Sequence, residues 1–321
     1  MSISSLCSKF RDYLLLTLLR FIAKSASRPP PCAFRTFTEI PSRDPTRTIK
    51  AHIYTPPILC HSNAPSAVII NWHAGGFILP VHGQDAKFCA SMAEDVGCVV
   101  IDADYRKAPE DAFPAAVEDV EDVVRWVLGR REVYDIGRIA VTGFSSGGTL
   151  ALGVCLRTQS AAGGGFGLDM GLTIPRAVVT FYPPTDKSIP PEAKTAVGDL
   201  VDPTPPFILE LFGKAYPGVT ADLANPLISP SRADLTRFSD SDYLILTCAG
   251  DLLCAEAEEL GHRLEQRATE DHRGRKVLVK RLEGVGHAWD KKARDGTREA
   301  EVRDEAYVLA AEFLKESLSR L

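Results

Sequence analysis

The chain has 321 residues, of which 45% are apolar and 25% are charged, and its 37 basic and 42 acidic side chains give a formal net charge of −5. This composition is typical of a globular protein and excludes a disordered, collagenous or multi-span membrane chain. The mild acidity also argues against a nucleic-acid partner, because contacts to phosphates need a basic surface.

The N-terminal segment, residues 10–23, reads FRDYLLLTLLRFIA and is predicted to form an amphipathic helix. Its apolar stretch is broken by charged residues and is too short for an integral membrane span. Five apolar residues fall on one helical stripe, which we expect to lie on the rest of the protein. Peripheral membrane contact is the alternative. The stripe consists of Leu14, Leu15, Leu18, Leu19 and Ile22.

Strand-like and helix-like segments alternate along most of the chain. Because alternating strands and helices build βαβ units, the pattern predicts a mostly parallel sheet covered by helices on both faces. Residues 163–167 read as a flexible glycine loop. Strands are expected at 34–40, 48–54, 67–72, 98–102, 138–142, 175–181, 243–248 and 276–282, and further helices at 84–96, 115–128, 147–159, 256–270 and 299–318.

Residues 184–231 interrupt this alternation. The stretch is rich in proline and lacks strand periodicity, which is more typical of a lid over a pocket than of a core element. We therefore expect one α/β domain over residues 1–321, with a cap built from about 1–33 and 184–231.

The segment Gly143-Phe144-Ser145-Ser146-Gly147 follows one predicted strand and precedes a predicted helix. G-x-S-x-G in this setting is typical of a nucleophile elbow, a turn so tight that glycines must flank the serine. The serine then stands at a helix N-terminus, whose dipole favours developing negative charge. Ser145 is the candidate nucleophile.

Three further motifs follow predicted strands, at the edge where open α/β sheets place their sites. His73-Ala74-Gly75-Gly76 contains adjacent glycines, which can aim successive backbone N–H groups at one oxyanion. A serine also needs a base and an orienting carboxylate. His287 and Asp251 are the candidates, and they follow Ser145 in the order Ser, Asp, His.

These motifs together resemble the hormone-sensitive-lipase-like branch of the α/β-hydrolases, which includes esterases, lipases and carboxylesterases, and especially its fungal members. The resemblance covers residues 66–321. It is carried by HAGGF at 73–77, DYRKAPEDAFPAAVED at 104–119, GFSSGG at 143–148, AGDLLCAE at 249–256 and GVGHAW at 284–289.

The resemblance implies an α/β-hydrolase fold with a helical cap. It assigns Ser145 as nucleophile, His287 as base and Asp251 as acid. It places the oxyanion hole at the backbone N–H groups of Gly75, Gly76 and Ser146. The remaining motif residues with expected supporting roles are His73, Gly143 and Gly147.

The chain departs from the family pattern at three places. Ala74 replaces the first glycine of H-G-G-G, but its N–H is not an expected donor, so activity should survive. Phe144 replaces the aspartate of G-D-S-A-G-G, which could alter the pocket or a supporting hydrogen bond. The segment Asp251–Glu256 keeps the acid of D-P-L-x-D-E but lacks its proline and second aspartate.

The sequence therefore predicts a serine hydrolase that cleaves a carboxylic ester of a small molecule, without metal or cofactor. Members of this branch that act in fungal secondary metabolism suggest such a pathway. The alternatives are a lactonase, an amidase, an acyltransferase or product-releasing hydrolase on the same residues, and a non-catalytic small-molecule receptor on the same fold. The oligomeric state is left open.

Eight cysteines are present without C-x-x-C spacing, so we expect buried thiols, no structural zinc and an intracellular protein. The terminal residues Ser319, Arg320 and Leu321 differ from the Ser-Lys-Leu peroxisomal signal by one basic residue for another. Peroxisomal import is therefore a hypothesis, with the cytoplasm as the alternative.

Overall fold

The computed structural model describes residues 3–26, 29–59, 64–156, 175–201, 203–218 and 221–320. One eight-stranded sheet has the order β1-β2-β4-β3-β5-β6-β7-β8. All pairs from β4 to β8 in this order are parallel, whereas β2 is antiparallel to both β1 and β4. The strands are β1 (Arg35–Pro41), β2 (Thr48–Tyr54), β3 (Ser66–Trp72), β4 (Val99–Ala103), β5 (Tyr134–Phe144), β6 (Ala177–Phe181), β7 (Asp242–Cys248) and β8 (Val277–Leu282).

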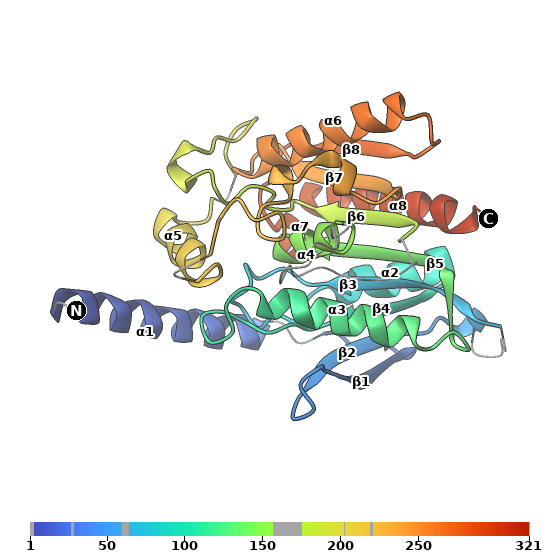
Figure 1. The fold of residues 1–321 in the computed structure, drawn as a ribbon, viewed down its shortest axis with the longest axis horizontal. Helices are drawn as coiled ribbons and strands as arrows, with labels where there is room; N and C mark the ends of the chain where they lie inside the picture. Colours follow the sequence, from blue (N-terminus) through green and yellow to red (C-terminus); the bar gives the residue numbers. More distant parts are fainter. Residues whose placement is uncertain are drawn as a thin grey trace, which may run out of the picture.

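Helices cover both faces of this sheet (Figure 1). Helices α3, α4 and α6 pack on one face, and α2 and α8 on the other. The helices are α1 (Ile3–Ala26), α2 (Ala86–Val96), α3 (Ala115–Leu128), α4 (Ser146–Val154), α5 (Pro206–Ala215), α6 (Cys254–Glu270), α7 (Trp289–Lys292) and α8 (Arg298–Ser319). Short 3-10 turns are η1 (Pro57–Leu59), η2 (Pro191–Ala193), η3 (Pro230–Arg232) and η4 (Leu235–Arg237).

The central strands are buried on both sides, as their continuous apolar runs predict for a parallel sheet. Successive side chains of a strand point to opposite faces. Val68 and Ile70 of β3 therefore join the core under α3 and α4, while Ile69 joins the core under α2 and α8. Each predicted strand is present. The ends shift by at most two residues, except that β5 begins four residues before the predicted start at 138.

Helix α1 is longer than predicted, and its orientation differs from the expected one. Leu14, Leu18 and Ile22 of the expected buried stripe are more than half exposed, whereas Leu16 is buried. The cause is Arg20, which donates to the carbonyl of Ile78 at 3.1 Å and pairs with Glu110 at 2.7 Å. This anchor turns Arg20 toward the body. The expectation for the stripe is wrong for its three exposed members, whereas Leu15 and Leu19 pack against the core as expected. The N-terminal part of α1 extends away from the body in Figure 1.

The helix expected at 147–159 ends at Val154, because Leu156 forms an isolated antiparallel bridge with Phe238. Residues 157–159 and the loop expected at 163–167 lie outside the described residues. Most of the insertion at 184–231 lacks regular structure, apart from α5 and short turns.

The described cysteines carry free thiols: Cys89, Cys98, Cys155, Cys248 and Cys254 are buried and Cys32 is half-buried. The side chains of Cys7 and Cys60 lie outside the described set. None of the helices in the described ranges is long and apolar enough to cross a membrane.

Candidate active site

Ser145 occupies the turn between β5 and α4. Its backbone has φ 50° and ψ −119°, a conformation that non-glycine residues rarely adopt. The turn requires glycine at 147, because a Cβ there would lie 1.9 Å from the carbonyl oxygen of Trp72. A Cβ on Gly143 would lie 2.2 Å from the carbonyl oxygen of Gly147. The strand–turn–helix geometry expected of a nucleophile elbow is therefore present.

The structure brings Ser145, His287 and Asp251 together, although they come from three separate segments. Ser145 Oγ lies 2.9 Å from Nε2 of His287, and Nδ1 of the same ring lies 2.7 Å from Oδ2 of Asp251. Asp251 follows β7 and His287 follows β8, so neighbouring parallel strands deliver both side chains to one edge of the sheet. This chain of contacts matches the geometry in which an imidazole activates a serine.

The environment of His287 favours its protonated form. Burial lowers the pKa of the imidazole, but the charge and hydrogen bond of Asp251 outweigh burial and raise that pKa above its ordinary value. The ring also meets the edge of Tyr182, with centroids 4.8 Å apart. His287 is therefore held in one orientation, and its imidazole has a raised affinity for a proton.

Three backbone N–H groups beside Ser145 have no acceptor in the described part of the chain: those of Gly75, Gly76 and Ser146. Gly76 has φ 61°, and a Cβ there would lie 2.4 Å from the ring of Phe212. Gly75, Gly76 and Ser145 line one cavity, and Ser146 opens α4. Unpaired donors beside a nucleophile can stabilise a developing oxyanion.

The His73 loop rests on Asp104 and Tyr105, which the sequence left without a role. His73 is fully buried, with Nε2 3.0 Å from an Asp104 carboxylate oxygen and its ring stacked on Tyr105. The Tyr105 hydroxyl reaches the carbonyls of His73 and Ala74 at 3.0 and 3.1 Å, and Ser146 Oγ at 3.1 Å. One phenol thus ties the glycine loop to the elbow.

Other residues of the 104–119 motif form ion pairs that hold in place the segment on which the His73 loop rests. Arg106 pairs with Asp119 at 3.0 Å and with Glu118 at 2.7 Å, and Asp119 also pairs with Arg47. These ion pairs fix the segment after β4 to the start of α3. The sequence signal was the family resemblance of the motif, but which contacts it makes depends on tertiary structure.

The cavity over Ser145 has a volume of about 480 Å³, within the range of small-molecule sites. Its wall is mainly apolar, and both segments expected to form a cap contribute to it. Leu19 and Ala23 come from α1, and Phe212 comes from α5. Tyr216, directly after α5, holds this helix against the body of the protein by stacking on Phe77, with ring centroids 3.6 Å apart.

Phe144 is fully buried, and it is not one of the described residues that line the cavity. It stacks on Phe181 at 4.3 Å between centroids and meets the edge of Phe88 at 5.0 Å. The expected alternatives were a changed pocket or a changed supporting hydrogen bond. The structure places this side chain in the core beneath the elbow, so among the described residues it does not change the cavity wall. The loss of a supporting hydrogen bond stays a prediction, because a phenyl ring cannot make the hydrogen bonds of a carboxylate.

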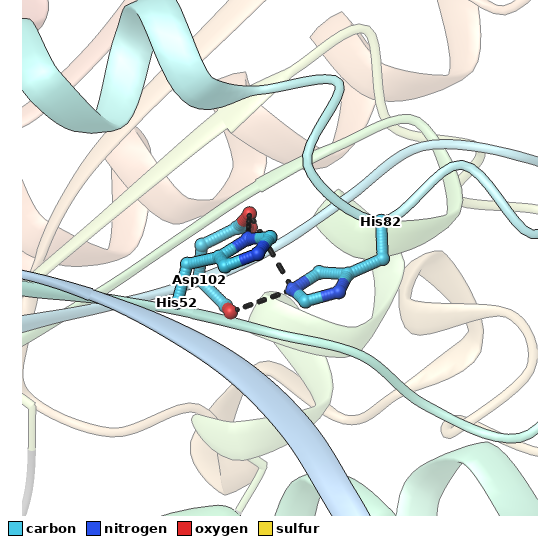
Figure 2. Close-up of side chains that lie close together, drawn as sticks. All are labelled: His52, His82 and Asp102. Carbon is cyan, nitrogen blue, oxygen red and sulfur yellow. Dashed lines mark hydrogen bonds and ion pairs between the residues drawn. The ribbon is translucent and has the colours of Figure 1, made fainter. Parts of the chain in front are cut away.

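Among the described residues, one group of histidine and acidic side chains is compact enough to hold a metal ion (Figure 2). It consists of His52, His82 and Asp102. The two rings stack with centroids 4.4 Å apart and planes 11° apart. Since nitrogen lone pairs lie in the ring plane, stacked rings cannot both aim at one ion, and His82 Nε2 also lies 2.9 Å from the Asp102 carbonyl oxygen. The arrangement suits a buried polar network better than a metal centre.

A family model described as the alpha/beta hydrolase fold matches residues 69–291. Ethyl acetate hydrolase of Pseudomonas putida is 31% identical over 278 residues, which cover 84% of this chain and 79% of that protein. Esterase LipI of Mycobacterium tuberculosis is 34% identical over 59% of this chain, and the match spans 57% of LipI. Human hormone-sensitive lipase is 28% identical over 50% of this chain and 14% of its own length.

Among solved structures, the carboxylesterase EstE1, cloned from a metagenomic library, superimposes with a TM-score of 0.76 at 25% identity. The superposition covers 96% of this chain and 98% of EstE1. The similarity therefore includes α1 and the 184–231 insertion as well as the sheet.

Proposed function

Because this chain belongs to the α/β-hydrolase fold family, we propose that it is a serine carboxylesterase acting through Ser145, His287 and Asp251. The observation that carries the proposal is the unbroken series of contacts from Ser145 Oγ through His287 to Asp251, at 2.9 and 2.7 Å. Relatives named as esterases and as an ethyl acetate hydrolase support ester hydrolysis as the reaction.

In the first half-reaction, Ser145 Oγ attacks the acyl carbon while His287 Nε2 takes its proton. The N–H groups of Gly75, Gly76 and Ser146 stabilise the oxyanion of the tetrahedral intermediate. The intermediate collapses, the alcohol leaves with the proton from His287, and the acyl group stays on Ser145.

In the second half-reaction, water attacks the acyl-enzyme and gives a proton to His287. Collapse of the second intermediate releases the acid and returns the proton to Ser145 Oγ. Asp251 holds the imidazole in one tautomer and stabilises its positive charge throughout. Each residue ends the cycle as it began, so hydrolysis requires no metal or cofactor.

The substrate is a compact ester of a small molecule with a short or medium acyl group. The cavity of about 480 Å³ supports this size, and α1 together with the 184–231 insertion acts as its cap. A role in a fungal secondary-metabolite pathway rests on resemblance alone. Lactone, amide and acyl-transfer chemistry would use the same residues, whereas a receptor would not need His287 beside Ser145.

The test is hydrolysis of nitrophenyl acetate, butyrate, octanoate and palmitate by the purified chain. We expect the shorter esters to be turned over fastest, unaffected by chelators. Ser145→Ala and His287→Ala should each lower kcat by roughly 10⁴-fold or more, because such residues act as a unit. Full activity in a folded Ser145→Ala protein would contradict the proposal, and activity lost to chelation and restored by zinc would contradict its metal independence.

Peroxisomal import through Ser319, Arg320 and Leu321 remains a hypothesis. Arg320 pairs with Asp242 at 3.0 Å and with Glu316, so a receptor would have to break these ion pairs. Leu321 lies outside the described residues. A fluorescent protein fused at the N-terminus should give punctate signal that disperses when Ser319–Leu321 is deleted. Diffuse signal with the native terminus would contradict it.

A further inference from the structure

Lys187 lies in the wall of the same cavity as Ser145 and His287. It follows β6 at the start of the insertion, where its backbone N–H donates to Ser229 Oγ at 2.8 Å. The backbone is therefore fixed, and the half-buried side chain lines the cavity together with leucine, isoleucine and proline side chains.

The other ionisable groups in that wall already have partners. His287 and Asp251 bind each other. Lys194 pairs with Glu256 and donates to the carbonyl of Asp186 at 2.8 Å.

Glu256, whose charge acts on Lys187, and the adjacent Asp186 have other partners as well. Besides binding Lys194, Glu256 accepts the backbone N–H groups of Thr185 and Asp186 at 2.9 and 3.2 Å. The Asp186 carboxylate pairs with Arg232 at 2.8 Å. Neither carboxylate forms an ion pair with Lys187, although the charge of Glu256 still acts on it at longer range.

Within the described ranges, no carboxylate forms an ion pair with Lys187. Its ammonium lies 5.6 Å from the ring centroid of Phe77, within the range of a cation–π contact, but a neutral ring does not supply the negative charge of a counter-ion. Burial, followed by the charge of Lys194, lowers the pKa of Lys187 to about 8, although the charge of Glu256 acts in the opposite direction. The side chain is thus still mostly charged at neutral pH, although its surroundings are apolar.

A charge in an apolar wall is unfavourable unless an ion of opposite sign approaches it. A substrate with an anionic group supplies that ion, and the apolar wall strengthens the attraction because little water screens it. One positive charge without an ion-pair partner matches one negative charge, which favours a carboxylate over a doubly charged phosphate.

We propose that Lys187 is a carboxylate-binding residue of the substrate pocket, so that the preferred substrates are esters that also carry a free carboxylate. This inference rests on the proposed esterase function and narrows its substrate class. Half-esters of dicarboxylic acids are the simplest members of that class. The ester carbonyl would lie at Ser145 while the distant carboxylate pairs with Lys187.

The test compares monoethyl adipate, which is anionic at neutral pH, with ethyl heptanoate, an uncharged ester of similar length. The readout is the ratio of the two kcat/KM values, measured as ethanol release on one preparation, so that the fraction of folded enzyme cancels. We expect the wild type to favour monoethyl adipate. Lys187→Met should lower this ratio about tenfold or more, which is the usual loss for a charge-assisted hydrogen bond.

Two further variants separate charge from packing. Lys187→Arg keeps the charge and should retain most of the preference. Lys214→Met removes an exposed lysine of α5 that pairs with Glu210, and should leave the ratio unchanged. A wild type that favours ethyl heptanoate, or a ratio that survives Lys187→Met, would overturn the inference.

A binding measurement distinguishes failure of this inference from failure of the proposed function. Monoethyl adipate is titrated calorimetrically into Ser145→Ala protein, with and without Lys187→Met. About tenfold weaker binding in the double variant supports the carboxylate site even if the wild type hydrolyses neither ester. Equal affinities overturn it even if the wild type is an active esterase.

Discussion

The ammonium of Lys291 lies 3.4 Å from the ring centroid of Phe144, the residue that precedes Ser145 in the chain. It also pairs with Asp85 at 2.6 Å and with Asp290 at 2.8 Å. Burial lowers the pKa of Lys291, but the charges of Asp290 and Asp85 outweigh it and raise that pKa above its ordinary value. Lys291 belongs to α7, which begins just after His287. Its buried ammonium therefore connects α7 to Phe144, the residue before Ser145.

Lys291→Met should destabilise the fold by about 3–5 kcal/mol, because it leaves two buried carboxylates without their cation. Urea denaturation measures the change in the free energy of unfolding. Lys87→Met is the matched control, since Lys87 is half exposed and pairs with the exposed Asp295. The control should lose at most about 1 kcal/mol. Similar losses in the two variants would contradict the importance of the buried ion pairs.

Gly147→Ala should abolish ester hydrolysis, because the new Cβ would overlap the carbonyl oxygen of Trp72 and displace the elbow. Gly153→Ala is the control in the same helix, where the nearest atom to a new Cβ is 3.6 Å away. The control should keep near-normal kcat. An active Gly147→Ala enzyme would mean that the elbow tolerates a shift of its backbone.

Tyr105→Phe tests the phenol that joins the glycine loop to the elbow. The ring still stacks on His73, but three oxygen contacts are lost. We expect kcat to fall about tenfold with little change in KM, because the loop positions oxyanion donors rather than substrate. Tyr13→Phe, on an exposed part of α1, is the control. A change confined to KM would contradict this positioning role.

The pH dependence of kcat/KM should reveal the raised pKa of His287. The imidazole must be neutral to accept the serine proton, so kcat/KM falls as the pH drops through that pKa, which lies above its ordinary value.

Asp251→Asn removes the larger of the two carboxylate charges that raise this pKa, so that burial is opposed only by the remaining charge of Asp290 and the pKa falls. The acid limb of the profile should therefore move to lower pH, while the plateau falls by up to about 10⁴-fold. An acid limb that stays at the same pH in Asp251→Asn would show that another group controls it.

The sequence predicted the sheet well because the central strands are continuous apolar runs, a pattern with few alternative structures. The meeting of Ser145, Asp251 and His287 was also predictable, since each follows a strand and parallel strands end at one edge. Roles that depend on tertiary contact were not predictable. Tyr105 and Lys187 carry no local signal that shows which loop or cavity they reach.

Helix α1 illustrates the same limit. Its periodicity identified a helix correctly, but the single contact network of Arg20 with Ile78 and Glu110 decides which side faces the body. A charged side chain outside the apolar stripe is therefore the anchor, and three of the five stripe side chains are exposed. Amphipathic patterning alone does not contain that information.

The most direct test of the central claim is mass spectrometry of the intact chain after treatment with a fluorophosphonate, followed by peptide mapping. If Ser145 is activated by His287, one adduct should form and map to Ser145. The adduct should be almost absent in His287→Ala, a variant that retains the serine. Labelling that occurs at another residue, or that proceeds equally fast in His287→Ala, would contradict the mechanism.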